Sequence, residues 1–156
     1  MNRLARLRRE VQTWHDLRLL IAITAWATAM PVLVRLLKLE TLLKLLTPVN
    51  RSQIPQQEDV QRAIRYTNLV LGCHPLVPNT CMMRSLVLYR ILRELGLSVT
   101  IHFGVRKADQ GLGGHCWLTQ TQWAGFSFED GVGQFVVMYA FPPASTRAGR
   151  SEVVCL

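Results

Sequence analysis

The sequence lacks regular cysteine spacing, although its 156 residues include four cysteines. These are Cys73, Cys81, Cys116 and Cys155, and no two of them form a C-x-x-C pair. The absence of paired spacing argues against a disulfide-stapled secreted domain and against a zinc ribbon. It favours free thiols in a reducing compartment, so we expect a cytoplasmic protein.

Acidic residues are also scarce: ten Asp and Glu oppose 18 Lys and Arg, which gives a formal net charge of +8. Residues 1–50 and 51–107 each carry eight basic residues against three acidic ones, whereas residues 108–156 carry two against four. Such a basic surface attracts anionic lipids, nucleic acids or acidic peptides. No basic segment alternates with aromatic residues and no zinc-finger spacing occurs, so we expect no nucleic-acid partner.

A long, uninterrupted apolar run is missing as well. Residues 19–34 carry no charge, but these sixteen residues include Pro31 and fall short of the roughly 20 that a membrane-spanning helix needs. Basic residues from Arg3 to Arg9, an apolar stretch and the run Ala27-Thr28-Ala29 also resemble a secretory signal. Because leucines continue on one helical face beyond this point, the signal interpretation competes with others.

The N-terminal third predicts two helices, over residues 3–30 and 32–46, that are kinked or broken at Pro31. Three interpretations stay open for these helices. They pack on the rest of the domain or on a partner, they contact a membrane at its surface or cross it, or they include a cleaved signal. Residues 1–50 are therefore expected to form a hydrophobic and basic helical extension.

Two further helices are expected after a polar linker at residues 48–57. The first should begin between Ser52 and Glu58 and end near Gly72. Its apolar face would consist of Val60, Ala63, Ile64, Thr67 and Leu71. The second should run from about Cys81 to Leu95, where Gly96 ends it.

After Gly96 the apolar period changes to two, which predicts strands. They are expected over residues 99–105, 115–121, 126–130 and 134–141, with a glycine-rich loop at residues 108–114. Helices followed by an antiparallel sheet indicate an α+β fold. We expect one enzymatic domain over residues 51–141 and a loose tail over residues 142–156.

Cys81 is the candidate nucleophile. It follows Asn79 and Thr80, which are both favourable N-cap residues, so its sulfur should lie in the first turn of a helix. The positive end of the helix dipole stabilises negative charge there, and the free backbone N–H groups can hold an oxyanion. The competing interpretation is a buried cysteine that acts as a small hydrophobic side chain.

His115 is the candidate general base, and Glu129 and Asp130 are candidate acids. A thiol, an imidazole and an acid suffice for acyl transfer through a thioester, because the acid holds the imidazole in one tautomer. If the two segments form adjacent antiparallel strands, only one of the two acids can face His115. We prefer Asp130, since a shorter side chain positions an imidazole more rigidly. His15, His74 and His102 are expected to have no catalytic role.

These residues occur in runs that resemble a known family. The runs are Cys81-Met82-Met83-Arg84-Ser85-Leu86, Glu94-Leu95-Gly96-Leu97, Phe103-Gly104-Val105-Arg106 and Gly114-His115-Cys116-Trp117. Over residues 58–140 the chain resembles transglutaminase-like cysteine proteases and, more narrowly, the B-protein maturation proteases of lasso-peptide biosynthesis. The resemblance implies a transglutaminase/papain-like core and a triad of Cys81, His115 and an acid. The chain departs from the family in having Cys116 where alanine is usual, and in a longer segment between His115 and the acid.

The resemblance also implies a reaction, which is removal of the leader from a ribosomally made precursor peptide without a cofactor. The family often recognises the leader through a small winged-helix-like domain, and residues 1–57 show no strands for one. We therefore expect a separate leader-recognition protein as partner, besides the precursor and the lasso cyclase. Residues 1–46 offer a surface for one of these partners or for a membrane.

Three alternatives remain at this point. An acyltransferase of transglutaminase type would use the same triad and pass the acyl group to an amine instead of water. A non-enzymatic, membrane-associated adaptor would function through its helices. A metal site of Cys73, His74, Cys81, His115 and Cys116 fits no regular zinc spacing, so we expect no metal.

Overall fold

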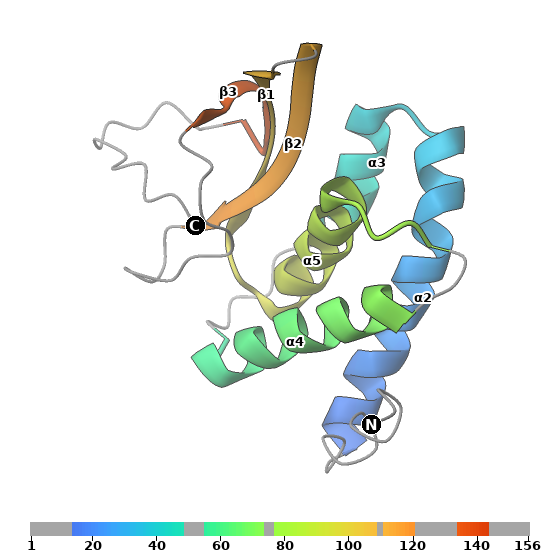
Figure 1. The fold of residues 1–156 in the computed structure, drawn as a ribbon. Helices are drawn as coiled ribbons and strands as arrows, with labels where there is room; N and C mark the ends of the chain where they lie inside the picture. Colours follow the sequence, from blue (N-terminus) through green and yellow to red (C-terminus); the bar gives the residue numbers. More distant parts are fainter. Residues whose placement is uncertain (1–13, 49–54, 74–76, 109–110, 121–133, 144–156) are drawn as a thin grey trace.

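The structure is a computed structural model that describes residues 14–48, 55–73, 77–108, 111–120 and 134–143. In these residues the elements are, in order, α2 (Trp14–Leu36), α3 (Leu39–Leu46), α4 (Gln57–Cys73), α5 (Cys81–Leu95), β1 (Val99–Ala108), β2 (Gly111–Gln120) and β3 (Val136–Phe141). The helices lie on one side of a three-stranded antiparallel sheet (Figure 1). The predicted α+β class is confirmed, whereas the strand expected at residues 126–130 lies outside the described residues.

Helix α5 is the centre of the fold, because it packs against α2, α3, α4, β1 and β2. Its buried side chains are Met83, Ser85, Leu86, Val87, Leu88, Tyr89, Ile91 and Leu92. Burial of each large apolar side chain contributes roughly 1.5–3 kcal/mol. Gly96 ends the helix in a left-handed conformation with φ of 98°, and its N–H donates to the carbonyl of Arg93. The predicted bounds of this helix are confirmed.

The sequence predicted a kink or a break at Pro31. A break is wrong, because α2 continues through Pro31 and ends at Leu36. Proline removes one backbone donor and tends to kink a helix. However, Ile23, Ala27 and Met30 form a face of α2 with no exposed surface. Packing of this face on α4 and α5 outweighs the lost hydrogen bond. Sequence periodicity alone does not reveal these contacts between helices.

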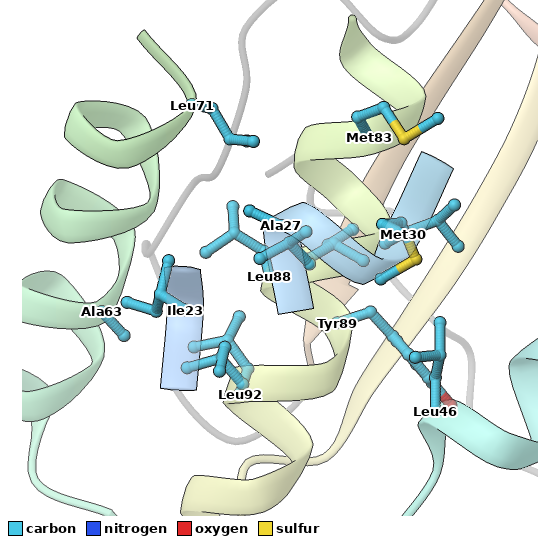
Figure 2. Packing of buried hydrophobic residues seen from close by; sticks show 14 of the residues in the cluster. Ile23, Ala27, Met30, Leu46, Ala63, Leu71, Met83, Leu88, Tyr89 and Leu92 are labelled. Atoms are coloured by element: carbon cyan, nitrogen blue, oxygen red, sulfur yellow. The ribbon is translucent and has the colours of Figure 1, made fainter. Parts of the chain in front are cut away.

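The N-terminal helices share one hydrophobic cluster with the rest of the chain. Figure 2 shows Met30 of α2 and Leu46 of α3 among side chains that include Leu92 of α5. A partly buried ion pair also joins α2 to α4, since Asp16 is 4% exposed and its carboxylate accepts a hydrogen bond from the half-buried Arg62 at 3.1 Å. The helical extension therefore packs on the rest of the chain, and the domain boundary near residue 50 stays a prediction.

In the sheet, β1 is the middle strand, with β2 and β3 on either side. β1 and β2 pair from Val99 with Gln120 to Ala108 with Gly111. The loop expected over residues 108–114 is therefore wrong from Gly111 onward, because glycine supplies the same backbone N–H and C=O groups to a ladder as other residues. β3 confirms most of the strand expected over residues 134–141.

Candidate active site

Cys81 is the first residue of α5, and its side chain is half-buried and not part of a disulfide. Thr80 is the N-cap with an extended backbone, and its hydroxyl accepts a hydrogen bond from the Met83 N–H at 3.3 Å. Capping satisfies only one of the backbone donors of the first turn, so others are available to an oxyanion. The first turn contains no acidic residue that would oppose a thiolate. The local sequence therefore places the thiol where negative charge is stabilised.

A buried hydrogen bond joins this end of α5 to β2. The Ser85 hydroxyl donates to the backbone carbonyl of Cys116 at 2.9 Å, and both residues are nearly inaccessible to solvent. Ser85 is one helical turn after Cys81, on the same side of α5. Cys116 directly follows His115 in the strand. The segments that carry the predicted nucleophile and the predicted base are therefore neighbours in the fold.

The His115 ring lies in a group of aromatic side chains. It stacks on Trp117 with ring centroids 6.0 Å apart and an angle of 16° between the planes. The ring of Phe135 lies 5.0 Å from it at a tilt of 33°. These contacts hold the imidazole against the sheet surface, because aromatic pairs in this distance range attract each other beyond simple burial.

Strand geometry places this aromatic group on the outer face of the sheet, away from α5. Side chains alternate along a strand, and paired residues of antiparallel strands point to the same face. Cys116, Leu118 and its partner Ile101 belong to the buried cluster formed with the helices. His115 and Trp117 therefore lie on the opposite face.

Cys81 is on the other side of this sheet. Its side chain packs against the cluster of buried helical residues. The structure thus brings the backbone segments of Cys81 and His115 together while directing the two side chains to different sides of β2. The assignment of these residues as nucleophile and base stays a prediction.

His102 lies on the same outer face as His115. Its ring also stacks on Trp117, with ring centroids 5.4 Å apart and an angle of 14° between the planes. The Nε2 atom of His102 is 2.7 Å from the hydroxyl of Thr119. Burial lowers the pKa of His102 from its usual value of 6.5, because the charged ring would lose hydration. His102 is therefore a stacked and hydrogen-bonded residue of the sheet, and its lack of a catalytic role stays a prediction.

Gly104, opposite His115 in the hairpin, makes room for this stack. A Cβ atom at Gly104 would lie 2.6 Å from the nearest Trp117 ring atom and 3.0 Å from the Val136 carbonyl oxygen. Real Cβ atoms do not approach that closely, so any larger residue would displace the ring. A glycine inside a strand often marks such an approach, which is the sequence signal that could have identified it.

The predicted acids, Glu129 and Asp130, both lie outside the described residues. To bring an acid beside His115, a further strand would have to pair with the edge of β2 that does not face β1. The described strands lie in the order β2-β1-β3, so that further strand is not among them.

Ser85 was not identified from the sequence as a residue of this site. Its signal is a polar residue on an otherwise buried helix face, one turn after the candidate nucleophile.

A cavity of about 330 Å³ lies at the other end of α5 from Cys81. Its lining residues are His15, Arg18, Leu19, Ala22, Ile91, Glu94 and Leu95. Across the described ranges, no three His, Cys, Asp or Glu side chains come together as metal ligands would.

The chain matches the model of a known protein family over most of its length. The model of the transglutaminase-like superfamily (Transglut_core3) matches residues 21–140. The match includes most of α2, all of α3, α4 and α5, and the sheet up to Ala140. No curated protein and no solved structure matches the chain significantly.

Proposed function

Because the chain belongs to the transglutaminase-like superfamily, we propose that it is a cysteine peptidase that removes the leader from a ribosomally made lasso-peptide precursor. The superfamily contains cysteine peptidases and transglutaminases. Membership therefore supports acyl transfer through a cysteine, without indicating the substrate. The observation that carries the proposal is the position of Cys81 at the capped N-terminus of α5. The narrower substrate rests on the motif resemblance around Cys81 and His115.

In the proposed reaction, the Cys81 thiolate attacks the carbonyl carbon of the leader–core peptide bond. A carbon–sulfur bond forms, the carbon–nitrogen bond breaks, and protonated His115 donates its proton to the departing amine of the core. Water then attacks the thioester and gives a proton to His115, which releases the leader as a carboxylic acid and restores the thiolate. Asp130 would hold the imidazole tautomer, and N–H groups of the first turn of α5 would bind the oxyanions.

This reaction needs the imidazole within hydrogen-bonding reach of the sulfur, so the proposal includes a movement of His115 to the α5 side of β2. Catalytic hydrogen bonds often form only in the complex with substrate. Gly113 and Gly114 precede His115, and a Cβ atom at Gly114 would meet no atom within 4 Å. Two successive glycines, of which Gly114 lies beside open space, allow the backbone rotation that would turn the ring.

The proposal also assigns partners and a compartment. We expect a separate leader-recognition protein, because the described N-terminal elements α2 and α3 are helices that pack on α4 and α5. The freed core would pass to the lasso cyclase. The free thiols of Cys73 and Cys81 support a reducing, cytoplasmic compartment.

The proposal is tested by incubating the full chain with a precursor peptide and its recognition protein, followed by mass spectrometry. Two fragments whose masses sum to the precursor plus one water indicate peptide hydrolysis. Loss of the leader with a gain of an amine on the acyl fragment would instead identify an acyltransferase, the second activity that superfamily membership supports. Cys81→Ala should abolish either reaction, whereas Cys73→Ala, at an exposed free thiol, should not. Unimpaired cleavage by Cys81→Ala would refute the cysteine mechanism.

A further inference from the structure

Helix α2 has two apolar faces, and only one of them is covered by the described part of the chain. The inner face contains Ile23, Ala27 and Met30, which have no exposed surface. The other face exposes large apolar side chains, which are Trp14 (75%), Leu17 (38%), Ile21 (61%), Val32 (56%) and Leu36 (75%). We call these five residues the α2 stripe. Successive members are 3, 4, 11 and 4 residues apart, and 11 residues make about three turns of helix, so all five lie along one side of α2.

The middle of the α2 stripe is less polar than its sequence suggests. Thr24 and Thr28 fall between Ile21 and Val32, and both are exposed. The Thr24 hydroxyl donates to the Leu20 carbonyl and the Thr28 hydroxyl to the Thr24 carbonyl, each at 2.8 Å. Because each hydroxyl already has a partner within the helix, its transfer out of water costs less. The stripe therefore presents a continuous low-polarity surface.

Charge on the exposed side of α2 has one sign. Arg18 and Arg35 are exposed near the two ends of the stripe. The acidic residue of the helix, Asp16, is buried against Arg62 of α4. The apolar stripe with a cation near each end is complementary to a partner that has an anionic outer layer and an apolar interior. A bilayer with anionic headgroups has this layering, and arginine and tryptophan side chains suit its interface.

From these observations we infer that α2 lies flat on an anionic membrane surface through the α2 stripe, with Arg18 and Arg35 in the headgroup layer. By length and composition alone, α2 also qualifies as a candidate membrane span. Crossing the bilayer would, however, pull Ile23, Ala27 and Met30 out of the helical core and separate Asp16 from Arg62. A flat position keeps the core intact and covers the exposed face.

A second copy of the chain fits this surface less well. A parallel pairing of two stripes places Arg18 beside Arg18 of the other copy, and a centred antiparallel pairing places Arg18 beside Arg35. Either arrangement brings like charges together without an exposed acid on α2 to offset them. An acidic protein partner is the remaining competitor, and the experiment below separates it from lipid.

The experiment is flotation of the full chain with vesicles of phosphatidylcholine alone and vesicles that also contain phosphatidylglycerol. We expect binding to the anionic vesicles, and weaker binding in high salt because the arginine contribution is screened. The double variant Ile21→Glu/Val32→Glu should reduce binding at least about tenfold. Arg18→Gln/Arg35→Gln should reduce it about fivefold for each cation removed.

The matched control is Leu112→Glu/Met138→Glu, which changes two exposed apolar residues of the sheet and should leave binding unchanged. Circular dichroism of each variant shows whether it is folded. Brominated lipid should quench tryptophan fluorescence in the wild type and much less in Trp14→Phe. This test is independent of the peptidase proposal, because it needs neither precursor nor cleavage.

Three results would overturn the inference. They are a failure to float with anionic vesicles, equal loss of binding in the sheet control, and unchanged quenching in Trp14→Phe. A dimer in sedimentation that Ile21→Glu/Val32→Glu dissociates would assign the stripe to a second copy. Failure to bind lipid combined with stripe-dependent binding to a purified leader-recognition protein would assign it to that protein.

Discussion

The helical half, at its central helix α5, and the sheet half, at its outer strand β3, differ in how completely their side chains are enclosed. Leu86 and Leu92 of α5 have no exposed surface, whereas Val136 and Met138 of β3 are 66% and 68% exposed. Cys81 belongs to the enclosed half and begins its central helix. His115 belongs to the sheet half. The position of the thiol therefore depends on a rigid core, and the position of the imidazole depends on a strand with an outer aromatic layer.

The two histidines of the outer face should differ most in their effect on cleavage. His115→Ala should lower the rate of leader cleavage about 10²–10⁴-fold, the range for loss of a general base. His102→Ala should change that rate far less, although it shares Trp117 as a stacking partner. Rates from mass-spectrometric time courses measure both. Equal losses in the two variants would mean that the aromatic stack, and not a proton transfer by His115, supports activity.

The enclosed half should respond strongly to truncation. Leu92→Ala removes a fully buried side chain and should lower the free energy of unfolding by about 2–5 kcal/mol. Met138→Ala, at an exposed position of β3, should change it by less than about 0.5 kcal/mol. Urea denaturation followed by circular dichroism measures both. Comparable losses would show that the sheet half is as closely packed as the helices.

Two glycines of the sheet differ in the space that surrounds them. Gly104→Ala places a Cβ atom 2.6 Å from the Trp117 ring and should cost about 1–3 kcal/mol of stability and alter the near-ultraviolet dichroism. Gly114→Ala meets no atom within 4 Å and should leave stability almost unchanged. If His115 turns toward Cys81 during catalysis, Gly114→Ala should still slow cleavage. Full activity of Gly114→Ala would argue against a backbone rotation at this position.

The smallest expected effect is the pH dependence of stability from His102. Its folded-state pKa lies below 6.5 because of burial, so the unfolded state binds the proton more readily. The neutral ring of His102 therefore makes its full contribution to the free energy of unfolding above pH 6.5. This contribution is lost as the pH falls through the lowered pKa. One such group changes stability by at most about 1.4 kcal/mol per pH unit. Urea denaturation at neutral and acidic pH should show a smaller difference in His102→Gln, and an unchanged difference would contradict this.

Local signals predicted much of the fold. The bounds of α5 follow from Thr80 and Gly96, which act within one turn of the helix, and the structure places the helix there. The helix at α4 and the strands at β1 and β3 also follow from periodicity. A break at Pro31 and a loop over the glycines after residue 110 were wrong predictions, because the packing of α2 and the pairing of β2 involve residues far apart in the sequence.

Short-range patterns in the sequence were sufficient to predict the type and order of the described elements, the family motifs, and the position of Cys81 at a helix start. These properties depend on neighbours within a few residues. Long-range contacts were needed to show that α2 continues through Pro31, that Ser85 joins α5 to β2, and that His115 lies on the outer face. Because side chains alternate along a strand, the sequence shows that His115 and Trp117 share one face of β2. Which face of the sheet this is depends on how β2 packs against α5.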